Sequence, residues 1–224
     1  MQAPCHTMPS FRVDRGLRIA QIVGMTTPSA DISSQDAGLG AFFRSSDLDA
    51  AGLSRHQLPR LLRSGAVERL SRGLYHRTDV EPSEHYSLAM ACAAVPQSTV
   101  CLLSALQVHD IGTQAPSAIW LAIPHKARLP RLEAPKLRIV RFSGPAWSYG
   151  VSDATFEGVP ARITSPARTI ADCFRFERLV GAEAAIEALD DGLRQHKVCV
   201  AELERVLEVL PSRRLRAALA VLQR

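Results

Sequence analysis

The apolar positions of residues 54–64 repeat with the period of an amphipathic helix. Three leucines recur at i, i+3 and i+4, the spacing of one helix face: Leu58, Leu61 and Leu62. Ser54 and Gln57 have the spacing of a capping box at its start, and Gly65 is a residue type that ends helices. Pro59 removes one backbone hydrogen bond, so we expect a kink in the first turn. The pattern predicts a short capped helix over residues 54–64.

The segments on both sides of this helix extend the pattern. Residues 37–43 are mostly apolar and predict a helix. Ser46 is suited to cap a second short helix at residues 47–51, which Gly52 would end. After Gly65, apolar residues flank a Ser-Arg-Gly turn and predict a β-hairpin: Val67, Leu70, Leu74 and Tyr75.

The remaining chain mixes helix and strand patterns. Ser165 followed by Pro166 predicts a helix start, with Ser as the cap and Pro in the first position. Arg168 and Asp172 are four residues apart on it and predict a structural ion pair worth about 0.2–0.5 kcal/mol. Further helices are predicted at residues 83–95, 98–109, 181–195, 200–210 and 212–222, and strands at 119–123, 137–142, 151–156 and 159–163.

Positive charge is concentrated in one segment. The chain holds 27 Lys and Arg against 22 Asp and Glu, a net charge of +5. Residues 41–77 alone hold seven Arg against Asp47, Asp49 and Glu68, which leaves a net +4. A basic segment of this kind favours a nucleic-acid partner. Aromatic residues make up only 5%, which disfavours a surface that stacks on unpaired bases.

Two short helices joined through Gly-Leu-Ser and followed by a hairpin have the layout of a winged helix-turn-helix. In that arrangement the second helix enters the major groove with its polar face towards the base edges. A single arginine on such a face is usually only solvated, but the capped helix, the glycine turn and the basic hairpin together favour DNA binding. The side chains expected to face bases are Arg55, His56, Gln57 and Arg60, with Ser54 beside them. Those expected to contact the DNA backbone are Arg63, Arg69, Arg72 and Tyr75.

The fold class that follows is α+β in two domains. A leader at residues 1–35 precedes the winged helix-turn-helix at 36–78, and a mixed domain at 79–224 holds a small sheet and C-terminal helices. A second basic cluster brackets two strands of the mixed domain. It is either a solvated loop or an auxiliary phosphate-contacting surface: Lys126, Arg128, Arg131, Lys136 and Arg138, with Arg141 beside them.

Other chemistries find little support in the residues. A metal-dependent nuclease needs an Asp and a Glu-x-Lys pair on adjacent strands, and no Lys follows Asp153 or Glu157 at that spacing. The sequence has no Gly-x-Ser-x-Gly motif, no Gly-rich phosphate loop and no paired Cys motif for zinc or disulfides. No apolar run approaches the roughly 18 residues that cross a bilayer. We therefore expect a cytoplasmic protein that is not an enzyme and needs no cofactor or metal.

One group of residues in the N-terminal segment forms a recognisable motif: Gly52-Leu53-Ser54, Leu58, Leu61, Gly65, Val67, Glu68-Arg69 and Arg72-Gly73-Leu74-Tyr75. These residues resemble the AbiEi-family antitoxins of type IV toxin–antitoxin (abortive infection) systems. The downstream similarity lies in Thr164 to Asp172, in Cys173-Phe174 through Gly181, in Ile186-Glu187-Ala188-Leu189 and in Leu203. The resemblance covers roughly residues 40–222.

The resemblance implies a repressor that binds inverted repeats of double-stranded DNA in the promoter of its own operon. It also implies a nucleotidyltransferase-like toxin as functional partner, neutralised through the C-terminal domain without a requirement for direct contact. A general winged-helix regulator with a ligand or partner pocket and no toxin remains an alternative, which the neighbouring gene would distinguish. A DNA nuclease is a third and weaker alternative, which incubation of plasmid with metal would test.

Overall fold

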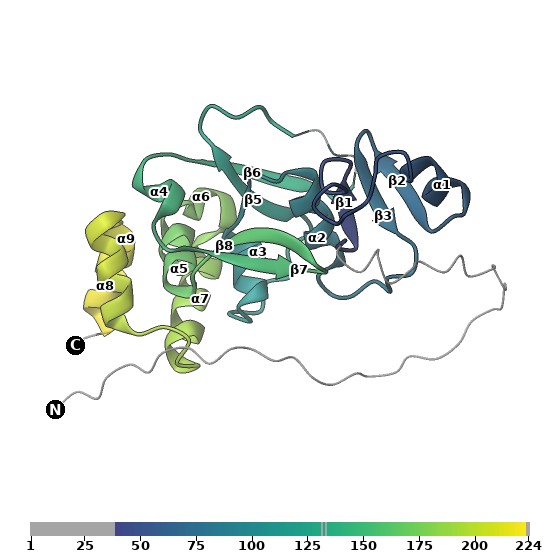
Figure 1. Ribbon diagram of the computed structural model, residues 1–224. Helices are drawn as coiled ribbons and strands as arrows, with labels where there is room; N and C mark the ends of the chain where they lie inside the picture. The colour runs from purple at the N-terminus through teal and green to yellow at the C-terminus, as the bar shows by residue number, and fades with distance from the viewer. Residues whose placement is uncertain (1–38, 131, 133, 223–224) are drawn as a thin grey trace, which may run out of the picture.

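The computed structural model describes residues 39–130, 132 and 134–222, so the predicted leader lies outside the described residues. A small three-stranded sheet lies at one end of the molecule, a five-stranded sheet in the middle, and the C-terminal helices at the other end (Figure 1). Helices and two sheets together confirm the α+β class.

The small sheet has the topology of a winged helix. It is antiparallel in the order β1-β3-β2, with β1 at Phe42–Arg44, β2 at Val67–Ser71 and β3 at Leu74–Arg77. The predicted hairpin is therefore present. The helix α1, at Leu58–Arg63, precedes it.

The helix predicted at residues 37–43 is wrong for the described part of that range, because Phe42 and Phe43 belong to strand β1. Neighbouring side chains on a strand point to opposite faces. Phe43 accordingly packs with α1 and Tyr75, while Phe42 packs with the second domain. An apolar run of this length fits a helix or a doubly buried strand equally well, so its periodicity could not distinguish them.

Residues 45–52 form a run of consecutive hydrogen-bonded turns rather than a regular helix. Gly52 ends it at φ +74°, with the N–H of Leu53 donating to the carbonyl of Leu48 at 2.9 Å. Ser46 does not cap this turn as predicted. Asp47 does so by accepting the backbone N–H of Arg44 at 2.7 Å, and the Ser46 hydroxyl donates to the same carboxylate at 2.9 Å.

Strands β1 and β3 of the small sheet carry buried side chains on both faces, so the winged helix is fixed to the rest of the molecule. The face that carries Phe42 and Leu74 packs against α2, at Tyr86–Ala94, in one apolar cluster. The Arg44 guanidinium donates to the carbonyl of Ala94 at 3.0 Å. These contacts join the three-stranded sheet and α2 in one packed unit.

A glycine pair completes this junction. The N–H of Ala41 donates to the carbonyl of Glu157 at 2.8 Å, which brings two chain segments side by side. A Cβ on Gly40 would lie 2.7 Å from the backbone of Gly158, so neither glycine can carry a side chain without moving the junction.

The five-stranded sheet has the order β6-β5-β4-β8-β7 and is mixed. Its strands are β4 at Thr99–Val100, β5 at Ile119–Pro124, β6 at Leu137–Phe142, β7 at Val151–Phe156 and β8 at Val159–Thr164. The strand β4 replaces the first residues of the helix predicted at 98–109, which as α3 runs only from Leu102 to Val108. Thr99 and Val100 are fully buried between two strands, a place that β-branched side chains suit.

Helices cover both faces of this sheet. The helix α2 packs on one face, and α3 with the C-terminal helices packs on the other (Figure 1). The short helix α4 runs from Pro145 to Ser148. The C-terminal helices are α5 at Pro166–Arg175, α6 at Glu177–Val180, α7 at Ala182–Arg194, α8 at Val200–Val209 and α9 at Arg213–Leu222. The predicted Ser165 cap is confirmed, since its hydroxyl accepts the N–H of Arg168 at 3.4 Å.

A buried ion pair joins α5 to its surroundings. The side chains of Arg168 and Asp172 are both 0% exposed, and Nε of Arg168 donates to Asp172 at 2.7 Å. The guanidinium also donates to the carbonyls of Tyr149 and Ala146, and it lies 4.9 Å above the ring of Phe142. Burial raises the pKa of the Asp172 carboxyl by more than the neighbouring guanidinium groups lower it. The predicted pair is structural, but it is far more buried than a surface i,i+4 pair.

Removing one partner of this pair should strongly destabilise the protein. We expect Asp172→Ala to lower the free energy of unfolding by about 3–5 kcal/mol, because Arg168 keeps its charge in the core without its carboxylate. The control is Arg194→Ala, since Arg194 pairs with Asp191 from a side chain that is 72% exposed. That change should cost about 0–1 kcal/mol. Urea denaturation measures both, and equal losses would contradict the structural role.

The junction between the domains should be sensitive to acid. Burial lowers the pKa of His76 from its usual 6.5, against the opposing charges of Glu68 and Asp79. Its ring packs against Phe42 and Tyr86. The unfolded chain therefore binds more protons than the folded chain as the pH falls through 6.5, and stability is lost in that direction.

We expect the free energy of unfolding to fall between about pH 7 and about pH 5, and to fall less in His76→Phe. Urea titrations at each pH measure this slope. His125 is exposed on the loop after β5, so His125→Phe is the matched control for the introduced phenylalanine. Identical slopes in all three proteins would rule out the effect.

Candidate nucleic-acid interface

The predicted capping box is only partly confirmed: Ser54 and Gln57 hold the turn before α1, and α1 itself begins at Leu58 without a side-chain cap. The N–H of Ser54 donates to Oε1 of Gln57 at 2.6 Å, and the N–H of His56 donates to the Ser54 hydroxyl at 3.1 Å. Pro59 lies in the first turn of α1, where its missing N–H removes no hydrogen bond that a regular helix requires. The disruption expected at Pro59 is therefore wrong, and the helix begins at Leu58 after a turn at 55–57.

The outer face of this turn and helix is basic and exposed. Its exposed side chains include Arg55, His56, Arg60 and Arg63. Arg55 is 3.8 Å from Asp49, but both side chains are about two-thirds exposed, so this contact is weak. Nε of Arg63 donates to the carbonyl of Pro59 at 3.2 Å, which leaves its terminal nitrogens to other acceptors.

The hairpin of β2 and β3 carries two further arginines at its tip. Gly73 supplies the φ of +76° that the turn needs, beside an exposed Arg72. Nε of Arg69 donates to the carbonyl of Ser71 at 3.2 Å. Among the residues that the structure describes, neither Arg60 nor Arg72 has a hydrogen bond or ion pair. These guanidinium groups are therefore available to an anionic partner.

Tyr75 does not belong to this exposed set. Its side chain is only 9% exposed, and its ring stacks on Phe43 with 5.7 Å between centroids. The face of β3 that carries Tyr75 packs in the apolar cluster of the winged helix. The expected contact of Tyr75 with a DNA backbone is therefore corrected to a core role. Gln57 and Ser54 remain exposed, but their side chains already serve the helix cap.

The auxiliary basic residues do not form one cluster. The parallel strands β5 and β6 pair from Ile119 with Leu137 to Pro124 with Phe142. Lys126 and Arg128 therefore follow one end of the pair, whereas Lys136 and Arg138 lie at the opposite end. All four are exposed, and Arg131 lies outside the described residues.

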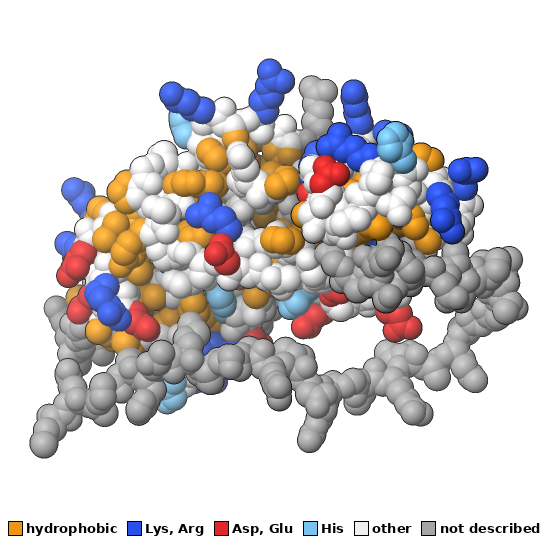
Figure 2. Space-filling model, viewed as in Figure 1, with side chains coloured by type: hydrophobic (Ala, Val, Ile, Leu, Met, Phe, Trp, Pro, Cys, Tyr) orange, Lys and Arg blue, Asp and Glu red, His pale blue; other side chains and the backbone are white. Residues whose placement is uncertain are grey.

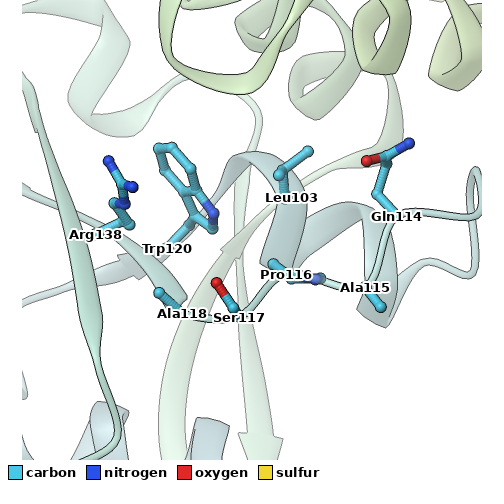
Figure 3. A pocket seen from close by; sticks show the side chains of 8 residues that line it. All are labelled: Leu103, Gln114, Ala115, Pro116, Ser117, Ala118, Trp120 and Arg138. Atoms are coloured by element: carbon cyan, nitrogen blue, oxygen red, sulfur yellow. The ribbon is translucent and has the colours of Figure 1, made fainter.

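Two of these arginines have structural contacts. Arg141 donates to the carbonyls of Pro124 at 3.2 Å and Ala127 at 2.9 Å, which fixes the loop that holds Lys126 and Arg128. Arg138 stands beside Trp120, 5.8 Å from its ring, at the edge of a small cleft of about 220 Å³ (Figure 3).

Basic side chains project along one edge of the molecule in Figure 2. They lie over the winged helix and over the loop that follows β5. Because the winged helix is packed onto the second domain, these two regions keep a fixed separation.

The residues considered for nuclease chemistry are not assembled into a metal site. Glu157 accepts a hydrogen bond from the Ser83 hydroxyl, and Asp153 is exposed on β7 opposite Arg162. Within residues 39–130, 132 and 134–222, no group of three His, Cys, Asp or Glu could hold a metal ion. In the same part of the chain, no helix is long and apolar enough to cross a membrane.

The sheet order, the capped helix and the basic hairpin define a winged helix-turn-helix of the kind found in transcriptional regulators. Residues 37–78 match a family model described as "Transcriptional regulator, AbiEi antitoxin". This segment is therefore similar to AbiEi antitoxin regulators, in agreement with the resemblance noted in the sequence. That family is a regulatory one.

No curated protein matches the chain. Among solved structures, the crystal structure of the RV2827C protein from Mycobacterium tuberculosis is similar at 17% sequence identity, with a TM-score of 0.49. The similarity covers 75% of this chain and 66% of that one.

The cap at Gln57 can be tested separately from any DNA contact. Gln57→Ala should lower the free energy of unfolding by about 0.5–1 kcal/mol, because the N–H of Ser54 loses its acceptor. Gln57→Glu keeps an acceptor oxygen and should retain wild-type stability. Thermal unfolding measures both variants, and equal losses from both would contradict the cap.

Proposed function

We propose that this protein is a sequence-specific DNA-binding repressor that acts as the antitoxin of a type IV toxin–antitoxin system. The observation that carries the proposal is the exposed, outward-facing basic surface on a winged helix that is packed against the rest of the molecule. A rigid scaffold lowers the entropy lost on binding, because the contact groups are already in place.

Each part of this surface has a role in the proposal. The turn and helix from Arg55 to Arg63 enter the major groove, where Arg55 and Arg60 reach guanine edges and His56 contacts a neighbouring base. Arg63 and Arg69 contact phosphates. Gln57 contributes its amide N–H₂ group, since its oxygen caps the helix.

The second domain adds phosphate contacts in this proposal. Lys126 and Arg128 lie on a loop that Arg141 fixes, along the same edge as the winged helix (Figure 2). Each phosphate that they neutralise makes the slope of log affinity against log salt more negative by about 0.9. Lys136 and Arg138 lie at the far end of the strands and contribute less.

The biological setting of the proposal is autoregulation. The protein binds inverted repeats in the promoter of its own operon, and its functional partner is a nucleotidyltransferase-like toxin that it neutralises without obligatory contact. A gene for such a toxin beside this one supports the antitoxin role. Rescue of growth by this protein when that toxin is expressed would establish it, and failure of rescue would leave a general regulator.

The central experiment is titration of the full chain against labelled DNA from upstream of its own gene. We expect Arg55→Ala and Arg72→Ala to weaken binding by about tenfold or more, with sequence preference relaxed only in Arg55→Ala. Arg194→Ala is the control, because Arg194 lies on α7 away from the winged helix. Unchanged binding in both winged-helix variants, or no binding by the wild type, would overturn the proposal.

A further inference from the structure

The hairpin of β2 and β3 is the wing of the winged helix. It exposes one large apolar side chain between Arg69 and Arg72. Leu70 is 39% exposed, whereas Val67, Leu74 and Tyr75 of the same hairpin are buried. Among residues 39–80, it is the large apolar side chain with the greatest exposure. Its neighbours Arg69 and Arg72 are exposed as well, so the wing tip is basic with an apolar centre.

A β-bulge is the reason for this exposure. Strand β2 pairs Arg69 with Tyr75, so a regular antiparallel ladder would place Leu70 opposite Leu74. Residues that lie opposite each other share a face of the sheet. Leu74 is buried against the second domain, and Leu70 would belong to that face.

The structure instead pairs Ser71 with Leu74 and leaves Leu70 as the extra residue of the bulge. The Arg69 guanidinium closes over this bulge by donating to the carbonyl of Ser71 at 3.2 Å. The bulge therefore leaves Leu70 out of the regular ladder, and Leu70 is exposed near the tip beside an exposed Ser71.

We propose that Leu70 is a specificity-determining residue that packs against the deoxyribose walls of a narrow minor groove. This inference rests on the proposed DNA binding. The sugar walls are the apolar part of duplex DNA, and the minor groove is only about 6 Å wide. A narrow A·T-rich groove also has the enhanced negative potential that favours the adjacent Arg72.

The base composition under the wing should then control affinity. The guanine N2 amino group occupies the floor of the minor groove, so a G·C pair at this point blocks the side chain. An inosine·cytosine pair lacks this amino group and keeps the major-groove edge of G·C. It should therefore restore tight binding.

The experiment uses duplexes selected by the full-length protein from a random pool, with the segment under the wing located by footprinting. That segment is made A·T, G·C or inosine·cytosine, and affinities are measured by fluorescence anisotropy. For the wild type we expect the G·C duplex to bind about fivefold more weakly than the other two. In Leu70→Ala this difference in affinity should fall below about twofold, because the variant should lose most of its affinity for the A·T duplex.

The control is Leu179→Ala, because Leu179 is 53% exposed on α6 and should keep the full difference. Equal weakening of all three duplexes by Leu70→Ala, or no change, would overturn the inference. A shift from dimer to monomer in sedimentation, without a change in duplex preference, would also overturn it and assign Leu70 to contact between copies.

Failure of the inference is distinguishable from failure of the proposed function. If the wild type selects no duplex from the pool, DNA binding itself is wrong. If Arg60→Ala abolishes binding while Leu70→Ala keeps the wild-type preference, only the role of Leu70 is wrong.

Discussion

The architecture depends on a three-stranded sheet that must bury both of its faces. A winged helix standing alone covers one face of its sheet with helices and leaves the other to solvent. Here Phe43 and Tyr75 fill the first face and Phe42 and Leu74 fill the second. The second domain therefore completes the core of the winged helix, and the close approach of Gly40 to Gly158 sets the distance between them.

This constraint connects the fold to the function we propose. Because the sheet is fixed, the turn and helix from Ser54 to Arg63 and the wing keep one orientation relative to the loop that holds Lys126 and Arg128. The second domain is itself rigid, since the buried Arg168–Asp172 pair ties α5 to the backbone before β7. A duplex thus meets a surface whose charged groups are already arranged.

Much of this could be predicted from the sequence, and the reasons are local. The Ser54–Gln57 cap, the glycine turns and the Ser165-Pro166 start depend on neighbouring residues, so their spacing sufficed. The helix predicted at residues 37–43 was wrong because Phe42 and Phe43 are both buried, one on each face of strand β1. This removes the alternation of apolar and polar residues that identifies a strand. The brief strand β4 was missed for the same reason. Tyr75 was placed on the DNA because no local pattern tells which face of a hairpin the core covers.

The exposure of Leu70 also lay beyond the sequence. Its place in an apolar pattern predicts burial, and only the pairing of Ser71 with Leu74 reveals the bulge. The split of the basic residues to two ends of β5 and β6 likewise required the parallel pairing of those strands. In both cases the decisive fact is strand register, which depends on residues far apart in the chain.

The most direct test of the central claim is amide hydrogen exchange of the full chain with and without its selected duplex. We expect added protection at residues 54–63 and 69–73, weaker protection at 125–128, and none at the exposed α6 and the start of α7. Protection confined to the C-terminal helices, or a winged helix that exchanges equally in both samples, would contradict it.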